Sequence, residues 1–262
     1  LCSHLVELIP IGQMALHLGG IIGAQHFLGD AAAVCEQTGS RLPGGAALAA
    51  VHADNVLGVL VLTSQIGIDV SAHQQDIDWQ RVAASGVQFA ILRAGYRGYT
   101  EGSIQEDAYF EQNLAGAIDA GLDVGVYFFS QAMDEQEARE EARFVLDKIS
   151  GYQLAYPVFF DWEKIGADAR SDAMDLTSLT TVTDTFCSEI EAAGYQAGLY
   201  FNQQLGYEEL HLPSLQGYTF WLAEYNDTPS FTYDFDLWQY ASDGSVDGID
   251  GDVDLNLAFI GK

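Results

Sequence analysis

From residue 66 onward, short apolar runs alternate with segments whose apolar residues recur at helical spacing. Each apolar run is brief and carries few charges, which is typical of buried strands in a parallel sheet. Eight runs of this kind predict eight strands. They are Ile66–Val70, Val87–Ala94, Val124–Phe129, Val158–Asp161, Ala197–Phe201, Phe220–Glu224, Phe235–Tyr240 and Val253–Asn256.

A helical segment follows each of the first five strands. These segments are 76–83, 107–120, 134–149, 177–193 and a shorter one at 203–210. Asp76 or Asp78 can cap the first helix, and Thr177 or Ser178 can cap the fourth. Strand–helix alternation predicts a parallel sheet covered by helices. Because the last three strands follow one another without full helices, the pattern predicts an α/β barrel whose last quarter has lost its helices.

Residues 1–65 have a different texture, rich in Ala, Gly, Leu and Val and poor in charge. Polar residues interrupt every apolar stretch before it reaches the roughly 18 residues of a membrane helix. We expect amphipathic helices around Leu5–Leu18 and Ala46–Leu62. The chain therefore divides into an N-terminal segment of unknown role, residues 1–65, and a barrel domain, residues 66–262.

Composition narrows the class of partner. The chain is 48% hydrophobic and 18% charged, as in packed globular proteins. A formal net charge of −28 argues against nucleic acid, because binding to phosphate backbones requires clustered Lys and Arg. The cysteines Cys2, Cys35 and Cys187 are too few and too scattered for a disulfide framework or a zinc site. We interpret them as structural thiols, although one disulfide stays possible.

The stretch Tyr156-Pro-Val-Phe-Phe-Asp161-Trp-Glu163 carries the strongest chemical signal. Side chains alternate along a strand, so Asp161 and Glu163 project to the same side, about 6–7 Å apart. A carboxylate pair at the end of a buried strand is costly unless it has partners or a role. Acid/base chemistry on a glycosidic bond uses one protonated and one charged carboxyl group. The simple alternative is a solvated strand end.

Other predicted strands end in further acids and in aromatic residues. In α/β barrels the active site lies at the carboxyl ends of the strands, so these residues should meet on one face. Carboxylates beside aromatic rings are typical of a sugar-binding site. The additional acids are Asp69, Glu224 and Asp254, and the expected substrate-binding residues are Arg93, Tyr127, Phe129, Tyr200, Trp221, Glu224, Tyr225, Trp238 and Tyr240.

Motifs for other chemistries are absent from the sequence. It contains no Gly-rich phosphate loop, no Gly-x-Ser-x-Gly elbow and no His-Glu-x-x-His zinc motif. The Asp-rich stretch Asp243–Asn256 could suggest a calcium loop, but it lacks the central Gly and the closing Glu of an EF-hand. Turn formation explains its Gly and Asp residues. We therefore expect no metal and no cofactor.

A series of motifs, in order along the chain, resembles a known family. They include Gly67-Ile-Asp-Val-Ser71, Asp78-Trp79, Arg93-Ala-Gly-Tyr96, Ala120–Ser130, Phe160-Asp-Trp-Glu163, Trp221-Leu-Ala223, Trp238-Gln-Tyr240 and Val253-Asp-Leu-Asn256. Residues 66–260 are similar to the family 25 glycoside hydrolases, the Chalaropsis-type lysozymes. The resemblance does not extend to residues 1–65.

This resemblance implies a modified TIM-like (β/α)5β3 barrel. It also implies an N-acetylmuramidase that is secreted or phage-delivered and acts on the glycan strands of bacterial peptidoglycan. We expect it to be a monomer without a membrane partner. Glu163 matches the general acid of the family, and Asp69, Asp161 and Asp254 match its other acidic residues. Glu224 adds an acid that we expect to tune the pH dependence. The alternatives are a catalytically silent glycan-binding barrel and a barrel glycosidase acting on chitin.

Two mechanisms are compatible with these acids. A carboxylate across the site could activate water and invert the anomeric carbon. Alternatively, the N-acetyl group of the substrate could attack that carbon while Asp161 orients it, which retains the configuration. The presence of Asp161 and Glu163 on one strand favours the second mechanism, although the sequence leaves both open.

Overall fold

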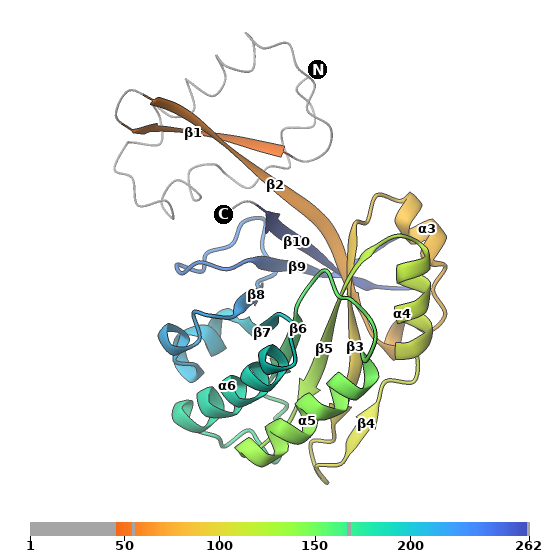
Figure 1. Cartoon of the computed structure of the whole chain (residues 1–262), viewed down its shortest axis with the longest axis vertical. Helices are drawn as coiled ribbons and strands as arrows, with labels where there is room; N and C mark the ends of the chain where they lie inside the picture. Colours follow the sequence, from red (N-terminus) through yellow and green to blue (C-terminus); the bar gives the residue numbers. More distant parts are fainter. Residues whose placement is uncertain (1–45, 54–55, 167–168, 261–262) are drawn as a thin grey trace.

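The computed structural model describes residues 46–53, 56–166 and 169–260, and it describes side chains from Thr63 onward (Figure 1). Within these ranges, all strands belong to a single sheet. The strands are β1 (Ala46–Ala53), β2 (Val56–Val70), β3 (Phe89–Arg97), β4 (Ile104–Glu106), β5 (Asp123–Ser130), β6 (Val158–Trp162), β7 (Ala197–Asn202), β8 (Thr219–Ala223), β9 (Leu237–Gly244) and β10 (Val253–Ile260).

Eight of these strands close into a barrel, in the order β2-β3-β5-β6-β7-β8-β9-β10 and back to β2. The pairs from β2 to β9 are parallel, as the sequence predicts. The last strand differs, because β10 runs antiparallel to both β9 and β2. The expectation of a wholly parallel sheet is therefore wrong at this strand. As a result, the amino end of β10 lies beside the carboxyl end of β2.

Helices cover the outside of the first half of the barrel (Figure 1). They are α3 (Trp79–Ala84), α4 (Phe110–Asp119), α5 (Glu135–Lys148) and α6 (Leu176–Ala192), and a short π-helix, η2 (Leu205–Glu209), takes the fifth position. The predicted modified TIM-like α/β barrel is thus confirmed. The N-cap of α6 is Asp175, which accepts a hydrogen bond from the Ser178 amide, so the prediction of Thr177 or Ser178 is wrong. No described helix has the length and apolar character to cross a membrane.

Alternation along the strands separates two apolar layers. Outward side chains such as Val126 and Phe160 pack beneath the helices, whereas inward ones such as Phe89, Phe159 and Trp221 fill the barrel. The filling is tight: a Cβ on Gly198 would lie 2.5 Å from the Phe159 ring. These inward apolar side chains come before the polar residues along the parallel strands, so the polar side chains collect at the carboxyl-terminal end of the barrel.

The segment before the barrel contains a hairpin. Strand β1 pairs antiparallel with the first part of β2, from Ala46 opposite Thr63 to Ala53 opposite Val56. The prediction of a helix around Ala46–Leu62 is therefore wrong. The second half of this range is rich in valine, which agrees with the preference of β-branched residues for strands. The helix expected around Leu5–Leu18 lies outside the described residues. Strand β2 also runs without interruption through the boundary drawn between residues 65 and 66.

The strand pairings predict where the chain can be shortened. Thr63 is the first β2 residue that pairs with β10, opposite Ile260, and β1 pairs only with β2. A chain beginning at Thr63 keeps every barrel pairing, so we expect thermal unfolding that is as cooperative as that of the full chain. A chain beginning at Ser71 lacks β2 and should not close the barrel. Failure of the Thr63 chain to fold would show that the hairpin is part of the barrel.

Candidate active site

Four acidic side chains from three strands meet at the carboxyl-terminal end of the barrel. Asp161 lies on β6, Glu163 directly follows β6, and Asp69 lies near the end of β2. Asp254 stands near the start of β10, and the reversed direction of β10 places it opposite Asp69 in the strand pairing. The charges of Glu163, Asp69 and Asp254 all act on Asp161. The structure thus brings together the four acids that the sequence singles out.

Asp161 is the least satisfied of the four acids. Its side chain is buried, and its Oδ1 atom has no hydrogen-bond partner among the described residues. Burial raises the pKa of Asp161 well above its usual value, the charges of Glu163 and Asp69 raise it further, and the Arg93 guanidinium opposes the rise. An unpaired buried acceptor costs about 1–3 kcal/mol. This oxygen is therefore a candidate to receive a hydrogen bond from a ligand.

Glu163 is half-buried beside Asp161. Burial raises the pKa of Glu163, and the charge of Asp254 raises it further. A carboxyl group that keeps its proton toward neutral pH can act as a general acid. Glu163 and Asp161 therefore provide a proton donor and a hydrogen-bond acceptor at the end of one strand.

Asp69 is held by amides. Its Oδ2 atom accepts hydrogen bonds from Gln239 Nε2 and Asn256 Nδ2, both at 2.8 Å. Burial raises the pKa of Asp69 well above its usual value, as does the charge of Asp254, and the two amides oppose the rise. The hydrogen bond between the two carboxyl groups raises the pKa of Asp69 and lowers that of Asp254, although burial keeps the Asp254 pKa above its usual value. Asp69 and Asp254 therefore form a coupled pair in which both carboxyl groups lose their protons less readily than isolated ones.

Gln239 and Asn256 extend this network to the aromatic residues. Gln239 Oε1 accepts from the hydroxyls of Tyr200, at 2.9 Å, and Tyr225, at 2.8 Å. Asn256 Oδ1 accepts from Trp221 Nε1 at 2.8 Å. The sequence analysis missed both amides. The alternation of Trp238-Gln239-Tyr240 could have revealed Gln239, because only one of its two sets of side chains can face the barrel interior.

The predicted aromatic residues do not all line the site. Tyr127 and Tyr200 make edge contacts with Trp221, at ring-centroid distances of 6.2 and 4.9 Å. Trp221 is 1% exposed, so it packs against these rings from the barrel interior. Phe129 pairs with Asp161 in the strand register, and Tyr225 is 55% exposed. These positions agree with an aromatic lining around the acids.

Two predicted aromatic residues lie elsewhere. Trp238 belongs to the outer apolar layer, and its Nε1 atom donates to the backbone oxygen of Glu224 at 2.8 Å. Tyr240 packs against the same outer layer, with its ring 5.6 Å from that of Trp238. Both residues alternate with Gln239 and therefore point away from the barrel interior. The structure does not bring them to the four acids.

Glu224 and Arg93 are each bound to protein partners. Glu224 Oε1 accepts from Asn226 Nδ2 and from the amide and hydroxyl of Ser230, and Oε2 accepts from the Phe231 amide. Its carboxylate therefore fixes the loop at 226–231. Arg93 Nε donates to Asp107 Oδ2 at 2.8 Å, an ion pair that the sequence analysis did not foresee.

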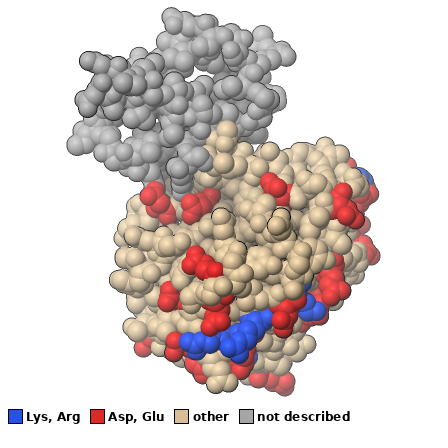
Figure 2. Space-filling view, viewed as in Figure 1, with Lys and Arg blue, Asp and Glu red and all other residues tan. Residues whose placement is uncertain are grey.

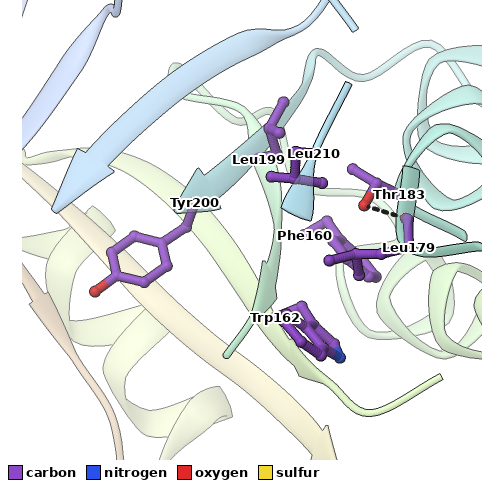
Figure 3. Close-up of a pocket in the computed structure, with 7 residues that line it drawn as sticks. All are labelled: Phe160, Trp162, Leu179, Thr183, Leu199, Tyr200 and Leu210. Carbon is purple, nitrogen blue, oxygen red and sulfur yellow. Dashed lines mark hydrogen bonds between the residues drawn. The ribbon is translucent and has the colours of Figure 1, made fainter. Parts of the chain in front are cut away.

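A small apolar cavity lies on the other side of the sheet (Figure 3). Its lining comes from β6, β7, α6 and the end of η2, and consists of Phe160, Trp162, Leu179, Thr183, Leu199, Tyr200 and Leu210. In Figure 3 the hydroxyl of Tyr200 points away from this cavity. At about 10 Å³, the cavity has no room for a sugar ring. It is therefore not the substrate site.

The described residues contain no group of three or more His, Cys, Asp or Glu side chains arranged to hold a metal ion.

Most basic side chains on the face shown in Figure 2 lie in one band, with acidic side chains beside them. Ion pairs among the described residues include Arg139–Glu135 and Lys148–Glu106. The Cys187 thiol is buried and free, whereas Cys2 and Cys35 lie outside the described residues.

The raised pKa of Asp161 predicts a stability effect. The pKa of Asp161 is higher in the folded protein than in the unfolded chain. Protonated Asp161 therefore contributes fully to folding stability below about pH 4, and this contribution is lost as the pH rises through the folded pKa. Asp161→Asn has no proton to lose, so we expect it to be more stable than the parent at pH 7, by about 0.5–2 kcal/mol. Urea unfolding between about pH 4 and 8 tests this.

The gain should shrink toward the acidic end of that range. The exposed Asp227, replaced by Asn, provides the control and should leave stability unchanged within about 0.5 kcal/mol. A lower stability of Asp161→Asn at pH 7 would show that the ionised carboxylate has a stabilising partner.

Comparisons with known proteins agree with this geometry. The model of the family "Glycosyl hydrolases family 25" matches residues 68–249. The chain is 30% identical to the uncharacterized protein YegX of Escherichia coli K12 over 201 residues, which are 73% of this chain and 68% of YegX. It is 26% identical to lysozyme M1 of Streptomyces globisporus over 235 residues, which are 83% of this chain and 75% of that lysozyme.

Among solved structures, the modular autolysin LytC of Streptococcus pneumoniae, in complex with a synthetic peptidoglycan ligand, superposes with a TM-score of 0.66 at 24% identity. The match covers 82% of this chain and 56% of the autolysin chain, so this chain spans little more than half the autolysin's length. That likeness supports the barrel fold. The family model covers most of the barrel and includes Asp69, Asp161 and Glu163. The chain therefore belongs to glycosyl hydrolase family 25.

Proposed function

We propose that the protein is a lysozyme that hydrolyses the β-1,4 bond between N-acetylmuramic acid and N-acetylglucosamine in bacterial peptidoglycan. The observation that carries this proposal is the pair formed by Asp161 and Glu163. Glu163 has a raised pKa, and Asp161 beside it presents a buried oxygen with no partner. Lysozyme M1 and the autolysin bound to a peptidoglycan ligand support the choice of substrate.

In this proposal Glu163 is the general acid. It gives its proton to the glycosidic oxygen as the bond from that oxygen to the anomeric carbon breaks. The N-acetyl oxygen of the substrate attacks the anomeric carbon, while Asp161 accepts a hydrogen bond from the acetamido N–H and stabilises its developing positive charge. Water then attacks the same carbon and returns a proton to Glu163. The bond from the N-acetyl oxygen to the anomeric carbon breaks in this step, so the N-acetyl group is regenerated on the sugar.

The state of Asp69 favours this route over direct attack by water. A base that activates water must be able to accept a proton. The Oδ2 atom of Asp69 already accepts hydrogen bonds from two amides. Asp161 Oδ1 is free of such partners. Asp69 and Asp254 therefore serve to raise the pKa of the neighbouring acids and to stabilise positive charge on the sugar.

The surrounding residues fit a glycan strand. The half-buried rings of Tyr127 and Phe129 and the exposed ring of Tyr225 offer apolar faces to pyranose C–H groups, and Arg93 adds a positive charge. None of these steps requires a cofactor. The proposed substrate places the activity outside the cell or at the cell wall. We propose residues 66–262 as the catalytic domain, with the start of β2 supplied by the preceding residues.

The identity of the cleaved bond can be tested with purified peptidoglycan. Released fragments are reduced with borohydride and analysed by mass spectrometry. Reduced N-acetylmuramic acid at the fragment ends is the expected result. Reduced N-acetylglucosamine would contradict the proposed bond. Binding to the wall without any released fragment would favour the silent glycan-binding barrel.

Glu163→Gln is expected to lower the rate of fragment release by at least about 10²-fold, because the amide keeps the shape but has no acidic proton. Circular dichroism and thermal unfolding establish that the variant folds. Glu208→Gln is the matched control, since Glu208 is an exposed glutamate on η2. Its activity should equal that of the parent. Activity of Glu163→Gln within about tenfold of the parent would remove Glu163 as the acid.

A further inference from the structure

Glu163 lies beyond the backbone pairings that fix β6. The last pair with β5 joins Ser130 and Trp162, and the last pair with β7 joins Asp161 and Tyr200. The strand itself ends at Trp162. The backbone that carries the proposed acid therefore depends on other contacts for its position.

A buried side chain supplies one of these contacts. Gln131, which directly follows β5, is 0% exposed. Its Nε2 atom donates to the backbone oxygen of Glu163 at 3.3 Å and to that of Ser130 at 2.9 Å. Its Oε1 atom accepts from the Ser171 hydroxyl at 2.7 Å, and this hydroxyl in turn accepts from Trp162 Nε1 at 3.0 Å. Gln131 and Ser171 thus hold both Trp162 and Glu163, and we name these two residues the bracket.

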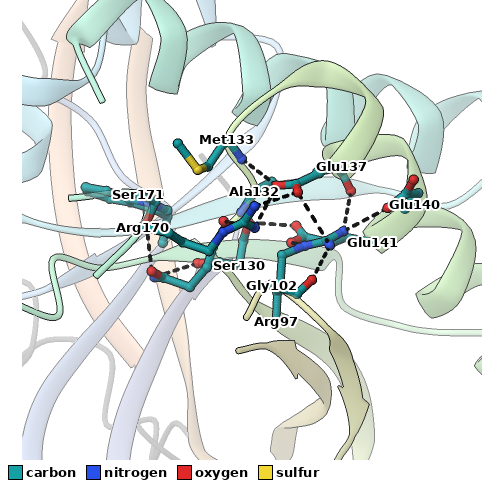
Figure 4. A network of polar contacts seen from close by, with 12 residues as sticks. Arg97, Gly102, Ser130, Ala132, Met133, Glu137, Glu140, Glu141, Arg170 and Ser171 are labelled. Carbon is teal, nitrogen blue, oxygen red and sulfur yellow. Dashed lines mark hydrogen bonds and ion pairs between the residues drawn. The ribbon is translucent and has the colours of Figure 1, made fainter. Parts of the chain in front are cut away.

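Arg170 fixes the bracket to the rest of the barrel (Figure 4). Its guanidinium forms two hydrogen bonds with the Glu137 carboxylate, at 2.8 and 2.7 Å, and reaches the Gln131 backbone oxygen at 3.3 Å. Its backbone amide donates to the Tyr99 oxygen at 3.0 Å. Figure 4 shows the Arg170 guanidinium against Glu137 of α5, with Ser171 on the other side of Arg170. Through its neighbour Arg170, Ser171 is therefore connected to helix α5 and to the turn between β3 and β4.

We propose that Gln131 and Ser171 are positioning residues for the acid, which they act on through the backbone of Glu163 and the ring of Trp162. This inference rests on the proposed role of Glu163. Two fully buried polar groups, the Gln131 amide and the Ser171 hydroxyl, form hydrogen bonds with the two residues at the end of β6. The Gln131 amide reaches the backbone oxygen of Glu163 itself, so it contacts the residue that carries the proposed acid.

The surroundings of Glu163 give the proposal a measurable consequence. The titratable groups that interact with it are Asp254 on β10, Asp161 on β6, Tyr200 on β7 and Tyr225 after β8. Burial is the main cause of its raised pKa. If the bracket is removed, the strand end can move outward and water can reach the carboxyl group. The pKa of Glu163 should then fall toward its usual value.

Two single variants of the full chain test this. Gln131→Met keeps the length of the side chain without its hydrogen bonds, and Ser171→Ala removes only the bridging hydroxyl. Carbon-13 NMR of labelled glutamate carboxyls follows the Glu163 titration, with Glu163→Gln identifying the signal. We expect a lower Glu163 pKa in both variants. We also expect kcat to fall by about 10–100-fold with KM within about twofold, as for a misplaced catalytic group, and the alkaline limb of the kcat profile to move to lower pH.

The controls separate positioning from loss of stability. Val145→Ala removes two methyl groups from a buried α5 residue outside the bracket, so it should lower the unfolding temperature without moving the Glu163 pKa. Ser171→Thr keeps the hydroxyl and should titrate like the parent. An unchanged Glu163 pKa in folded Gln131→Met and Ser171→Ala would overturn the proposal. If the pKa shifts but the parent releases no peptidoglycan fragments, the positioning role stands and the proposed function fails.

Discussion

The burial of four carboxyl groups close to one another is the constraint on which the rest of this structure depends. Asp69, Asp161, Glu163 and Asp254 share one end of the barrel, and burial raises the pKa of each. Such a cluster is unfavourable, and the closed barrel holds it together. The reversed strand β10 is essential to this arrangement, since a parallel strand would carry Asp254 to the opposite end. The fold therefore gathers four carboxyl groups with raised pKa values at one end of the barrel.

The four acids differ in the hydrogen bonds that the protein makes to them, and this difference is the basis for the roles that we propose for them. Asp69 is bonded to two amides and to Asp254, whereas Asp161 keeps an oxygen without a partner. Glu163 stands just past the paired strand, where Gln131 holds its backbone. Sites of function often keep unfavourable groups that a stable protein would avoid. Here the unfavourable group is the unpaired oxygen of Asp161.

The sequence predicts the barrel strands and the four acids well, because apolar runs and strand-end carboxylates are local signals. It fails where the deciding contact is distant. The direction of β10 depends on its neighbours, and the amides that hold Asp69 come from strands far away along the chain. Strand alternation decides that Gln239 faces inward and Trp238 outward, and composition alone favours the tryptophan as a ligand contact. The sequence predicts a helix where the structure has the hairpin before the barrel, because this Ala- and Leu-rich run fits a helix equally well.

We propose that the free oxygen of Asp161 orients the substrate's own N-acetyl group, so that two successive displacements occur at one carbon. Two displacements restore the original configuration, whereas direct attack by water inverts it. Proton NMR of product released within the first minutes, before mutarotation, distinguishes these outcomes. We expect an initial β anomer. An initial α anomer would contradict this proposal and would assign the activation of water to a carboxylate across the site.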